Sequence, residues 1–260
     1  MENVGKREAS LMHAIETSGL TKIYGKKIAV RDLGLTVEEG EIFSLLGVNG
    51  AGKTTAIRML SCLTEPTAGD ALVFGHSIRH DTQAVKRLIN VSPQETAVAS
   101  NLTVRENLEL FARLYGCSRK EAEERTRRLL ESFSLHEVET MRAGKLSGGW
   151  QRRLSIAMAL ISEPKLLFLD EPTLGLDILA RRMLWETIGA LKGKMTVILT
   201  THYLEEAEAL SDRIAIMAHG SLRALGTAGE LKKAAACDSF EDAFIRLATD
   251  GKPLTGAEAG

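Results

Sequence analysis

The sequence lacks any apolar run that approaches the length of a membrane span. Its longest uninterrupted apolar stretches, such as residues 156–161, are short beside the roughly 18 residues that a crossing requires. We also expect no signal peptide, and residues 1–10 are polar and without pattern. We therefore expect the chain alone to be soluble, with its apolar runs in a buried core.

Cysteine is scarce as well. Cys62, Cys117 and Cys237 are far apart in the sequence and do not have the spacing of a metal site. Three is also an odd number, which leaves one thiol without a disulfide partner. We expect all three to be reduced packing residues of a cytosolic protein.

No excess of one charge sign is present either. Charged residues make up 26% of the sequence, yet the net charge is -1. No overall field therefore attracts nucleic acid or an anionic membrane. The 260 residues are enough for a substantial core and are compatible with one domain or with two.

A glycine-rich motif follows an apolar strand predicted at residues 41–46 and precedes a helix predicted at residues 56–63. It matches G-x-x-x-x-G-K-T in the context of a phosphate-binding loop (P-loop), and this context disfavours a glycine-rich turn with a chance lysine. Glycines let backbone N–H groups face phosphate oxygens. Lys53 supplies a positive charge for the β and γ phosphates, and the Thr54 hydroxyl can complete a Mg²⁺ shell. The predicted nucleotide-binding residues here are Gly47, Val48, Asn49, Gly50, Ala51, Gly52, Lys53, Thr54 and Thr55.

Residues 146–177 join a Ser-Gly-Gly turn, a helix predicted at residues 150–161, an apolar strand at residues 166–169 and two carboxylates. The turn, residues 147–149, predicts an anion site, because a helix start offers free N–H groups. The P-loop already surrounds the phosphates of one nucleotide, so this second site has no ligand in its own subunit. A nucleotide bound to another copy, across a dimer interface, is a simple explanation.

Two carboxylates end the strand of this run. Asp170 is placed to hold Mg²⁺ through its waters, opposite Thr54. Glu171 is the better general base, because it can point from the strand end at a water behind the γ-phosphate. The alternative is that both acids only cap the turn before Pro172. It is weakened because Lys53 and Thr54 already require a metal partner.

The other patterns predict an α/β chain with a helical insertion. Helical periodicity extends over residues 103–133, where Val104, Leu108, Phe111 and Tyr115 share one face. The insertion is predicted to span residues 93–164. Further strands are predicted at residues 13–17, 28–37, 71–74, 195–200, 213–217 and 221–225, and further helices at residues 81–88, 180–191 and 239–247.

Three residues beside predicted strands have ordinary local interpretations. Tyr24 beside a glycine is typical of a turn aromatic, and Gln94 after Pro93 is typical of a surface loop. A lone histidine after a strand, such as His202, is usually structural.

Taken in order, Tyr24, GVNGAGKTT, Gln94, LSGG, LLFLDEP, GLD and His202 resemble the nucleotide-binding subunit of an ATP-binding-cassette (ABC) transporter. The resemblance covers nearly the whole chain, and LSGG followed by a strand ending in Asp-Glu is its family-specific part. It implies an α/β fold: a P-loop nucleoside-triphosphatase core with a mostly parallel sheet, helices and a small antiparallel β part, and with an inserted helical subdomain. ATP and Mg²⁺ are the implied ligands.

The resemblance also implies roles around the subunit's own ATP. Tyr24 would stack on adenine, and Gln94 would contact Mg²⁺ or the attacking water and report to the membrane partner. His202 would hold the γ-phosphate and orient Glu171 and the water. The catalytic set is then Lys53, Glu171 and His202, and the metal set is Thr54, Gln94 and Asp170.

For the second site, the resemblance implies a signature motif that acts on the opposite subunit's ATP. Its residues are Ser147, Gly148, Gly149 and Trp150. Asp177 would lie in the loop between the two sites. The family most often has glutamine where Trp150 stands, which puts the contacts of that position in doubt. Val48 replaces a common proline, which removes rigidity but no hydrogen bond.

The predicted domain organisation is a single ABC ATPase domain over residues 11–260. The catalytic core comprises residues 11–92 and 165–226, and the helical subdomain residues 93–164. C-terminal helices follow at residues 227–248, and residues 1–10 and 249–260 are expected to be flexible termini.

The implied function is an ATP-hydrolysing subunit that dimerises around two ATP molecules, as a homo- or heterodimer, and drives separate transmembrane permease subunits. Residues 95–107 are where cytoplasmic loops of the permease are expected to dock, which would hold this subunit on the inner face of the cell membrane. The whole sequence is similar to subunits of ABC-2-type exporters, including drug exporters.

Two other function classes remain open. A soluble ABC ATPase acting on ribosomes or DNA usually has two cassettes or a long coiled-coil insertion, and this chain has neither, nor a basic tract. Nucleic acid is therefore not an expected partner. A P-loop kinase or GTPase switch would leave LSGG and His202 without a role.

Overall fold

The computed structural model describes residues 13–249. Of the termini predicted to be flexible, residues 1–10 and 249–260, all but Thr249 lie outside the described residues. Thr249, which the prediction grouped with the C-terminal tail, is instead the C-cap of the last helix and donates a hydrogen bond to Ile245 O (2.7 Å).

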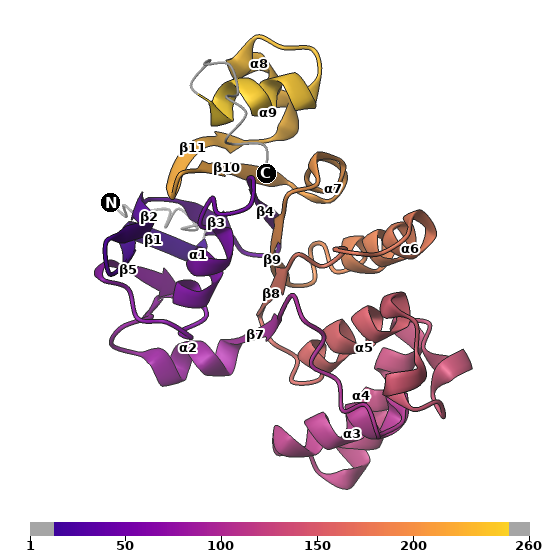
Figure 1. Cartoon of the computed structure of the whole chain (residues 1–260). Coiled ribbons are helices and arrows are strands. Elements are labelled where there is room, and N and C mark those ends of the chain that lie inside the picture. The colour runs from indigo at the N-terminus through magenta and orange to yellow at the C-terminus, as the bar shows by residue number, and fades with distance from the viewer. Residues whose placement is uncertain (1–12, 250–260) are drawn as a thin grey trace, which may run out of the picture.

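A small antiparallel sheet forms the N-terminal part of the described chain (Figure 1). The strand order is β2-β1-β5-β6, and β3 pairs with β1. Strands predicted at residues 13–17 and 28–37 are present with different limits, because residues 20–24 pair with β2 as a hairpin around Gly25. The strands are β1 (His13–Tyr24), β2 (Lys27–Leu33), β3 (Thr36–Glu38), β5 (Ala68–Val73) and β6 (His76–Ser77).

The larger sheet is mostly parallel and has the order β11-β10-β4-β9-β8-β7. Strands β10, β4, β9, β8 and β7 are parallel neighbours, and β11 closes a terminal hairpin. This confirms the predicted mostly parallel core with a small antiparallel part. The strands are β4 (Ile42–Leu46), β7 (Ile89–Ser92), β8 (Leu166–Asp170), β9 (Thr196–Thr201), β10 (Arg213–Ala218) and β11 (Ser221–Gly226).

Strand β8 shows how the cores are arranged. Leu166 and Phe168 pack into a core shared with the antiparallel sheet and the first helix, whereas Leu167 and Leu169 pack on the opposite side. Such an uninterrupted apolar run is typical of a parallel strand that is covered on both faces. The strand is therefore held rigidly at the point where its two carboxylates emerge.

Helices cover the sheet and form the insertion between β7 and β8, which contains α3, α4, α5 and two short 3₁₀ turns (Figure 1). Capping boxes at Thr103 and Ser118 start α3 and α4. Within residues 13–249, no helix has both the length and the apolarity to cross a bilayer. The helices are α1 (Lys53–Leu60), α2 (Thr82–Leu88), α3 (Val104–Leu114), α4 (Arg119–Ser132), η1 (His136–Val138), η2 (Ala143–Lys145), α5 (Gly148–Leu160), α6 (Ile178–Gly189), α7 (Leu204–Leu210), α8 (Ala228–Ala235) and α9 (Phe240–Ala248).

Candidate active site

The candidate site lies where the parallel strands end. Strand β4 leads into the P-loop, β8 ends at Asp170, β9 ends just before His202, and β7 ends two residues before Gln94. Because these strands are parallel neighbours, their carboxyl ends meet at one edge of the sheet. Segments far apart in the sequence thus contribute to one site.

The P-loop fits tightly between neighbouring strands. A Cβ on Gly47 would lie 2.4 Å from Met217 O, and a Cβ on Gly52 would lie 2.5 Å from Ala29 O. Gly52 also has a φ of 103°, in the region that favours glycine. These two positions therefore require glycine for close backbone packing.

Lys53 and Glu171 form a buried ion pair behind this loop. Lys53 is 5% exposed, and its Nζ lies 3.2 Å from Glu171 Oε1. The same Nζ donates to Gly47 O (2.7 Å) and Val48 O (3.4 Å). The ammonium group is thus held at the loop that the sequence predicts to bind phosphates.

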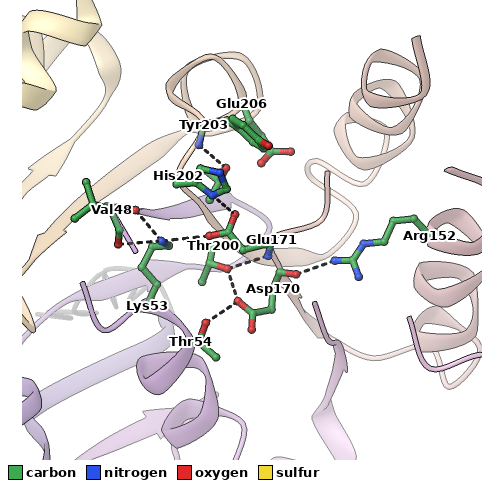
Figure 2. Close-up of polar contacts among 12 residues, drawn as sticks. Val48, Lys53, Thr54, Arg152, Asp170, Glu171, Thr200, His202, Tyr203 and Glu206 are labelled. Atoms are coloured by element: carbon green, nitrogen blue, oxygen red, sulfur yellow. Dashed lines mark hydrogen bonds and ion pairs between the residues drawn. The ribbon is translucent and has the colours of Figure 1, made fainter. Parts of the chain in front are cut away.

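His202 binds the other oxygen of the same carboxylate. Its Nδ1 lies 2.8 Å from Glu171 Oε2. Figure 2 shows Glu171 between Lys53 and His202, with one oxygen directed at each. The Glu171 carboxylate is therefore fixed by Lys53 and His202. A carboxylate fixed in this way is positioned to accept a proton from a water that lies beside it.

Asp170 lies one residue back and is held by two hydroxyl groups. Thr54 Oγ1 and Thr200 Oγ1 donate to its Oδ1 at 3.1 and 2.5 Å. Thr200 Oγ1 also accepts a hydrogen bond from Glu171 N (3.0 Å). Thr200 therefore orients both carboxylate residues, a role that the sequence analysis missed, although Thr200 lies one residue before the end of β9, directly opposite Asp170 of β8.

The donors around Thr54 suit Mg²⁺. Magnesium prefers oxygen ligands and is usually held by one or two carboxylates together with phosphates and waters. Thr54 supplies a hydroxyl oxygen and Asp170 a carboxylate within hydrogen-bond distance of it. Gln94 and Thr54 line one pocket, and Asp170 lies behind Thr54 outside that lining. The described residues contain no cluster of three or more acidic, histidine or cysteine side chains that would indicate a different kind of metal site.

An open pocket of about 300 Å³ brings most of the predicted residues together. Residues from the P-loop line it together with Gln94, Glu171 and His202. Lys27, Ala29 and Leu174 also line the pocket and were not predicted. The P-loop contributors are Asn49, Gly50, Ala51, Gly52, Lys53, Thr54 and Thr55.

Tyr24 lies near this pocket without lining it. It ends β1, is paired across the hairpin with Lys27, and is 46% exposed. Lys22 Nζ lies 5.1 Å from the centroid of its ring. The ring is thus an exposed aromatic surface beside a residue that does line the pocket.

The signature motif is not part of the pocket lining. Ser147 has the backbone geometry of an N-cap for α5 but makes no side-chain capping bond, and Ser147 and Gly148 are exposed. Gly149 lies close to α6, because a Cβ there would be 3.1 Å from Ala180 Cβ. Trp150 is partly buried, and the Arg153 guanidinium lies 4.8 Å from its ring centroid.

Asp177 also lies outside the pocket lining and caps the next helix. Its Oδ1 accepts a hydrogen bond from Ala180 N (2.9 Å), which explains why α6 begins at Ile178 rather than at the predicted residue 180.

A buried acidic side chain, Glu206 on α7, lies near His202 and Tyr203 (Figure 2). It is fully buried and accepts a hydrogen bond from Trp185 Nε1 on α6 (3.1 Å). Burial raises the pKa of Glu206. This bond joins the helix that follows Asp177 to the helix that follows His202.

A family model described as ABC transporter matches residues 30–174, a span from within β2 to beyond the two carboxylates. The chain belongs to the ABC transporter family. It is an ATP-binding and ATP-hydrolysing subunit, and the family membership favours this class over the kinase or GTPase switch.

Two curated relatives illustrate how similar the chain is to known ABC proteins. It is 47% identical over 220 residues to the daunorubicin/doxorubicin resistance ATP-binding protein DrrA of Streptomyces peucetius, covering 84% of this chain and 67% of that protein. It is 45% identical over 216 residues to the Nod factor export ATP-binding protein I of Rhizobium sp. strain N33, covering 82% of this chain and 71% of that protein.

Two solved structures share the fold of the ABC ATPase subunit. The ATP-binding subunit of an ABC transporter superposes with a TM-score of 0.80 at 31% identity, covering 90% of this chain and 99% of that chain. A dimeric ATP-binding cassette in a post-hydrolysis state, bound to ADP and Pi, gives a TM-score of 0.74 at 26% identity, covering 82% and 98%.

Proposed function

We propose that two copies of this subunit, or this subunit and a similar one, close around two ATP molecules with Mg²⁺ and drive separate transmembrane permease subunits that export a substrate. The observation that carries the proposal is the separation of two half-sites. The P-loop, Glu171 and His202 line one pocket, whereas the exposed Ser147 and Gly148 start α5 outside it.

At this site, the side chains have separable tasks. Lys53 binds the β and γ phosphates, and Glu171 accepts the proton of the attacking water while His202 keeps its carboxylate oriented. Thr54, Asp170 and Gln94 would hold Mg²⁺, which neutralises charge on the transferred phosphoryl group. Thr200 fixes the two acidic residues relative to each other.

The surface around Asp177 fits a second copy of the chain. Leu174, Ile178, Leu179 and Met183 are exposed by 41, 72, 76 and 47%. Clustered exposed apolar residues mark interaction surfaces. Leu174 lies shortly after the carboxylates, and Ile178, Leu179 and Met183 lie on α6, the helix that Gly149 approaches, so a copy bound here would approach the signature motif.

Residues 95–107 are the proposed docking site for the permease. This stretch begins beside Gln94, which lines the pocket, and Glu95 and Ala97 are exposed. Docking here would hold the subunit at the inner face of the cell membrane. The names of the two relatives, a drug resistance protein and an export protein, support export as the direction.

Co-purification tests this proposal against the alternative of a ribosome- or nucleic-acid-associated ATPase. The tagged chain is expressed in its own host, membranes are solubilised in mild detergent, and bound proteins and nucleic acids are identified. We expect a membrane protein with several spans, and ATP turnover that changes when it is present. Recovery of RNA or DNA without a membrane protein would contradict the proposal.

A further inference from the structure

Arg152, on helix α5 that follows the signature turn, is a buried cationic side chain. It is 4% exposed, and its guanidinium donates to four backbone carbonyls. Nε donates to Pro172 O (2.8 Å), Nη2 to Asp170 O (2.8 Å), and Nη1 to Gln94 O (3.2 Å) and to Pro93 O. Figure 2 shows its side chain directed at Asp170 from the side opposite Thr54.

The guanidinium keeps its charge in this position. Burial lowers the pKa of Arg152 to about 10, although the nearby carboxylates of Asp170, Glu206 and Glu171 act in the opposite direction. At neutral pH the side chain therefore presents all its N–H donors in a planar fork. A planar fork can bridge two loops, which the single ammonium group of a lysine cannot do equally well.

One of the two loops is the turn that carries Glu171. Glu171 has a φ of 48°, a left-handed conformation that non-glycine residues rarely adopt. The carbonyls of the residues on either side of it, Asp170 and Pro172, are both bonded to Arg152. Arg152 thus holds the strained turn that places the Glu171 carboxylate between Lys53 and His202.

The other loop begins at Pro93 and Gln94 and continues into the exposed part of residues 95–107. Its far end is also tied to the helical insertion, because Asn107 accepts a hydrogen bond from Ala99 N (2.8 Å) and donates to Thr103 O (2.8 Å). A displacement of this segment would therefore act on the carbonyls that Arg152 binds.

We propose that Arg152 is a positioning residue that couples the segment after Gln94 to the placement of Glu171. The inference rests on the proposed function, because the docked permease is what would displace residues 95–107. When residues 95–107 are in the position seen here, Arg152 binds the carbonyls of Pro93 and Gln94 and those of Asp170 and Pro172, and Glu171 is held for hydrolysis. When residues 95–107 are displaced, the turn at Glu171 loses its support.

Two variants test this role in the complete ATPase with its permease. Arg152→Met removes the donors at similar length, and Arg152→Lys keeps the charge but not the fork. We expect the ATP Kd to stay within about twofold, and kcat to fall about 100-fold for Arg152→Met and less for Arg152→Lys, as expected for a misplaced catalytic group. The ratio of permease-stimulated to basal turnover should fall towards one in both.

Arg125→Met is the matched control. Arg125 lies in the same helical insertion, donates to Ile161 O (2.9 Å) and pairs with Glu163, away from the carboxylates. It should keep both kcat and stimulation. Wild-type kcat and stimulation in Arg152→Met or Arg152→Lys would overturn the inference. Loss of ATP binding together with loss of folding in both variants would overturn it as well, because Arg152 would then serve the fold.

A double variant separates this inference from the proposed function. If Arg152 acts through Glu171, adding Arg152→Lys to Glu171→Gln should leave the residual turnover unchanged, whereas an additive loss would contradict the coupling. If Glu171→Gln itself hydrolyses ATP at the wild-type rate, the proposed catalytic role fails, whatever Arg152 does.

Discussion

The two phosphate-related regions of this chain differ in how far its own residues complete them. At the P-loop, Lys53 and His202 each bind an oxygen of Glu171, and these groups share one pocket. At the signature turn, Ser147 makes no capping bond and is exposed with Gly148. The first region is assembled within one chain. The second is an exposed helix start, and its residues do not line the pocket of their own subunit.

The cause of this difference is the position of each region in the fold. The P-loop and both carboxylates follow parallel strands, so pairing of the strands brings them to one edge. The signature turn instead follows a 3₁₀ turn and starts a helix in the insertion between β7 and β8. Only one helix and one strand separate Ser147 from Glu171 in the sequence, yet Glu171 lines the pocket and Ser147 is exposed outside it. The predictions below test the two regions separately.

The largest effect is expected from Glu171→Gln. This change removes the proposed base but keeps the shape of the side chain, so turnover should fall about 1000-fold, while the ATP Kd stays within about twofold. Phosphate release and nucleotide binding are measured on the same protein. Glu205→Gln, at an exposed position on α7, is the control and should keep wild-type turnover.

Lys53→Ala should weaken ATP binding rather than turnover alone. It removes a charged donor to phosphate and leaves the buried Glu171 without its cation, so we expect about a 100-fold higher ATP Kd. Isothermal titration of the isolated subunit measures this value, with Lys26→Ala in the exposed β1–β2 turn as the control. An unchanged Kd would show that Lys53 does not bind the phosphates.

Ser147→Arg should have the reverse pattern. A bulky cation at the exposed turn would disturb the signature surface without entering the pocket of its own subunit. We expect turnover to fall about 10- to 100-fold and the ATP Kd of the isolated subunit to stay within about twofold. Loss of ATP binding by the isolated variant would place the signature in its own subunit's site. Ser132→Arg, on the exposed side of α4, is the control.

The smallest effect is expected from Trp150→Gln, which introduces the residue most often found at this position of the family. Trp150 is partly buried and stacks with Arg153, so its loss should lower the free energy of unfolding by about 1–2 kcal/mol. Urea denaturation measures this change, and Tyr115→Gln, at an exposed aromatic, should cost less. An unchanged stability would mean that the stack contributes nothing to folding.

Much of the site follows from local sequence, because its parts are short motifs with fixed neighbours. The strand, glycine-rich loop and helix around Lys53, and the strand that ends in Asp170, need no distant information. Thr200 and Arg152 are different. Their partners come from segments far away in the sequence, and neither a hydroxyl at a strand end nor an arginine in a helix has a distinctive pattern.

The errors in the fold have local causes instead. The periodic pattern over residues 103–133 placed Tyr115 on one face with Val104 and Leu108, but those two are fully buried and Tyr115 is 51% exposed. Gly116 has a φ of 86° and ends α3, and Ser118 then caps a new helix, so the face does not continue. Helix α7 was not predicted at all, because seven residues are too few to show helical periodicity.

The central claim is that the P-loop and the signature turn of one chain belong to two different ATP sites. Mixing Lys53→Ala and Ser147→Arg subunits tests it most directly. A mixed dimer would carry one site with both defects and one intact site. Random pairing gives half mixed dimers with one of two sites intact, so turnover should recover to about a quarter of the wild-type value. If both motifs served the same ATP within one chain, the mixture would remain as inactive as its two components.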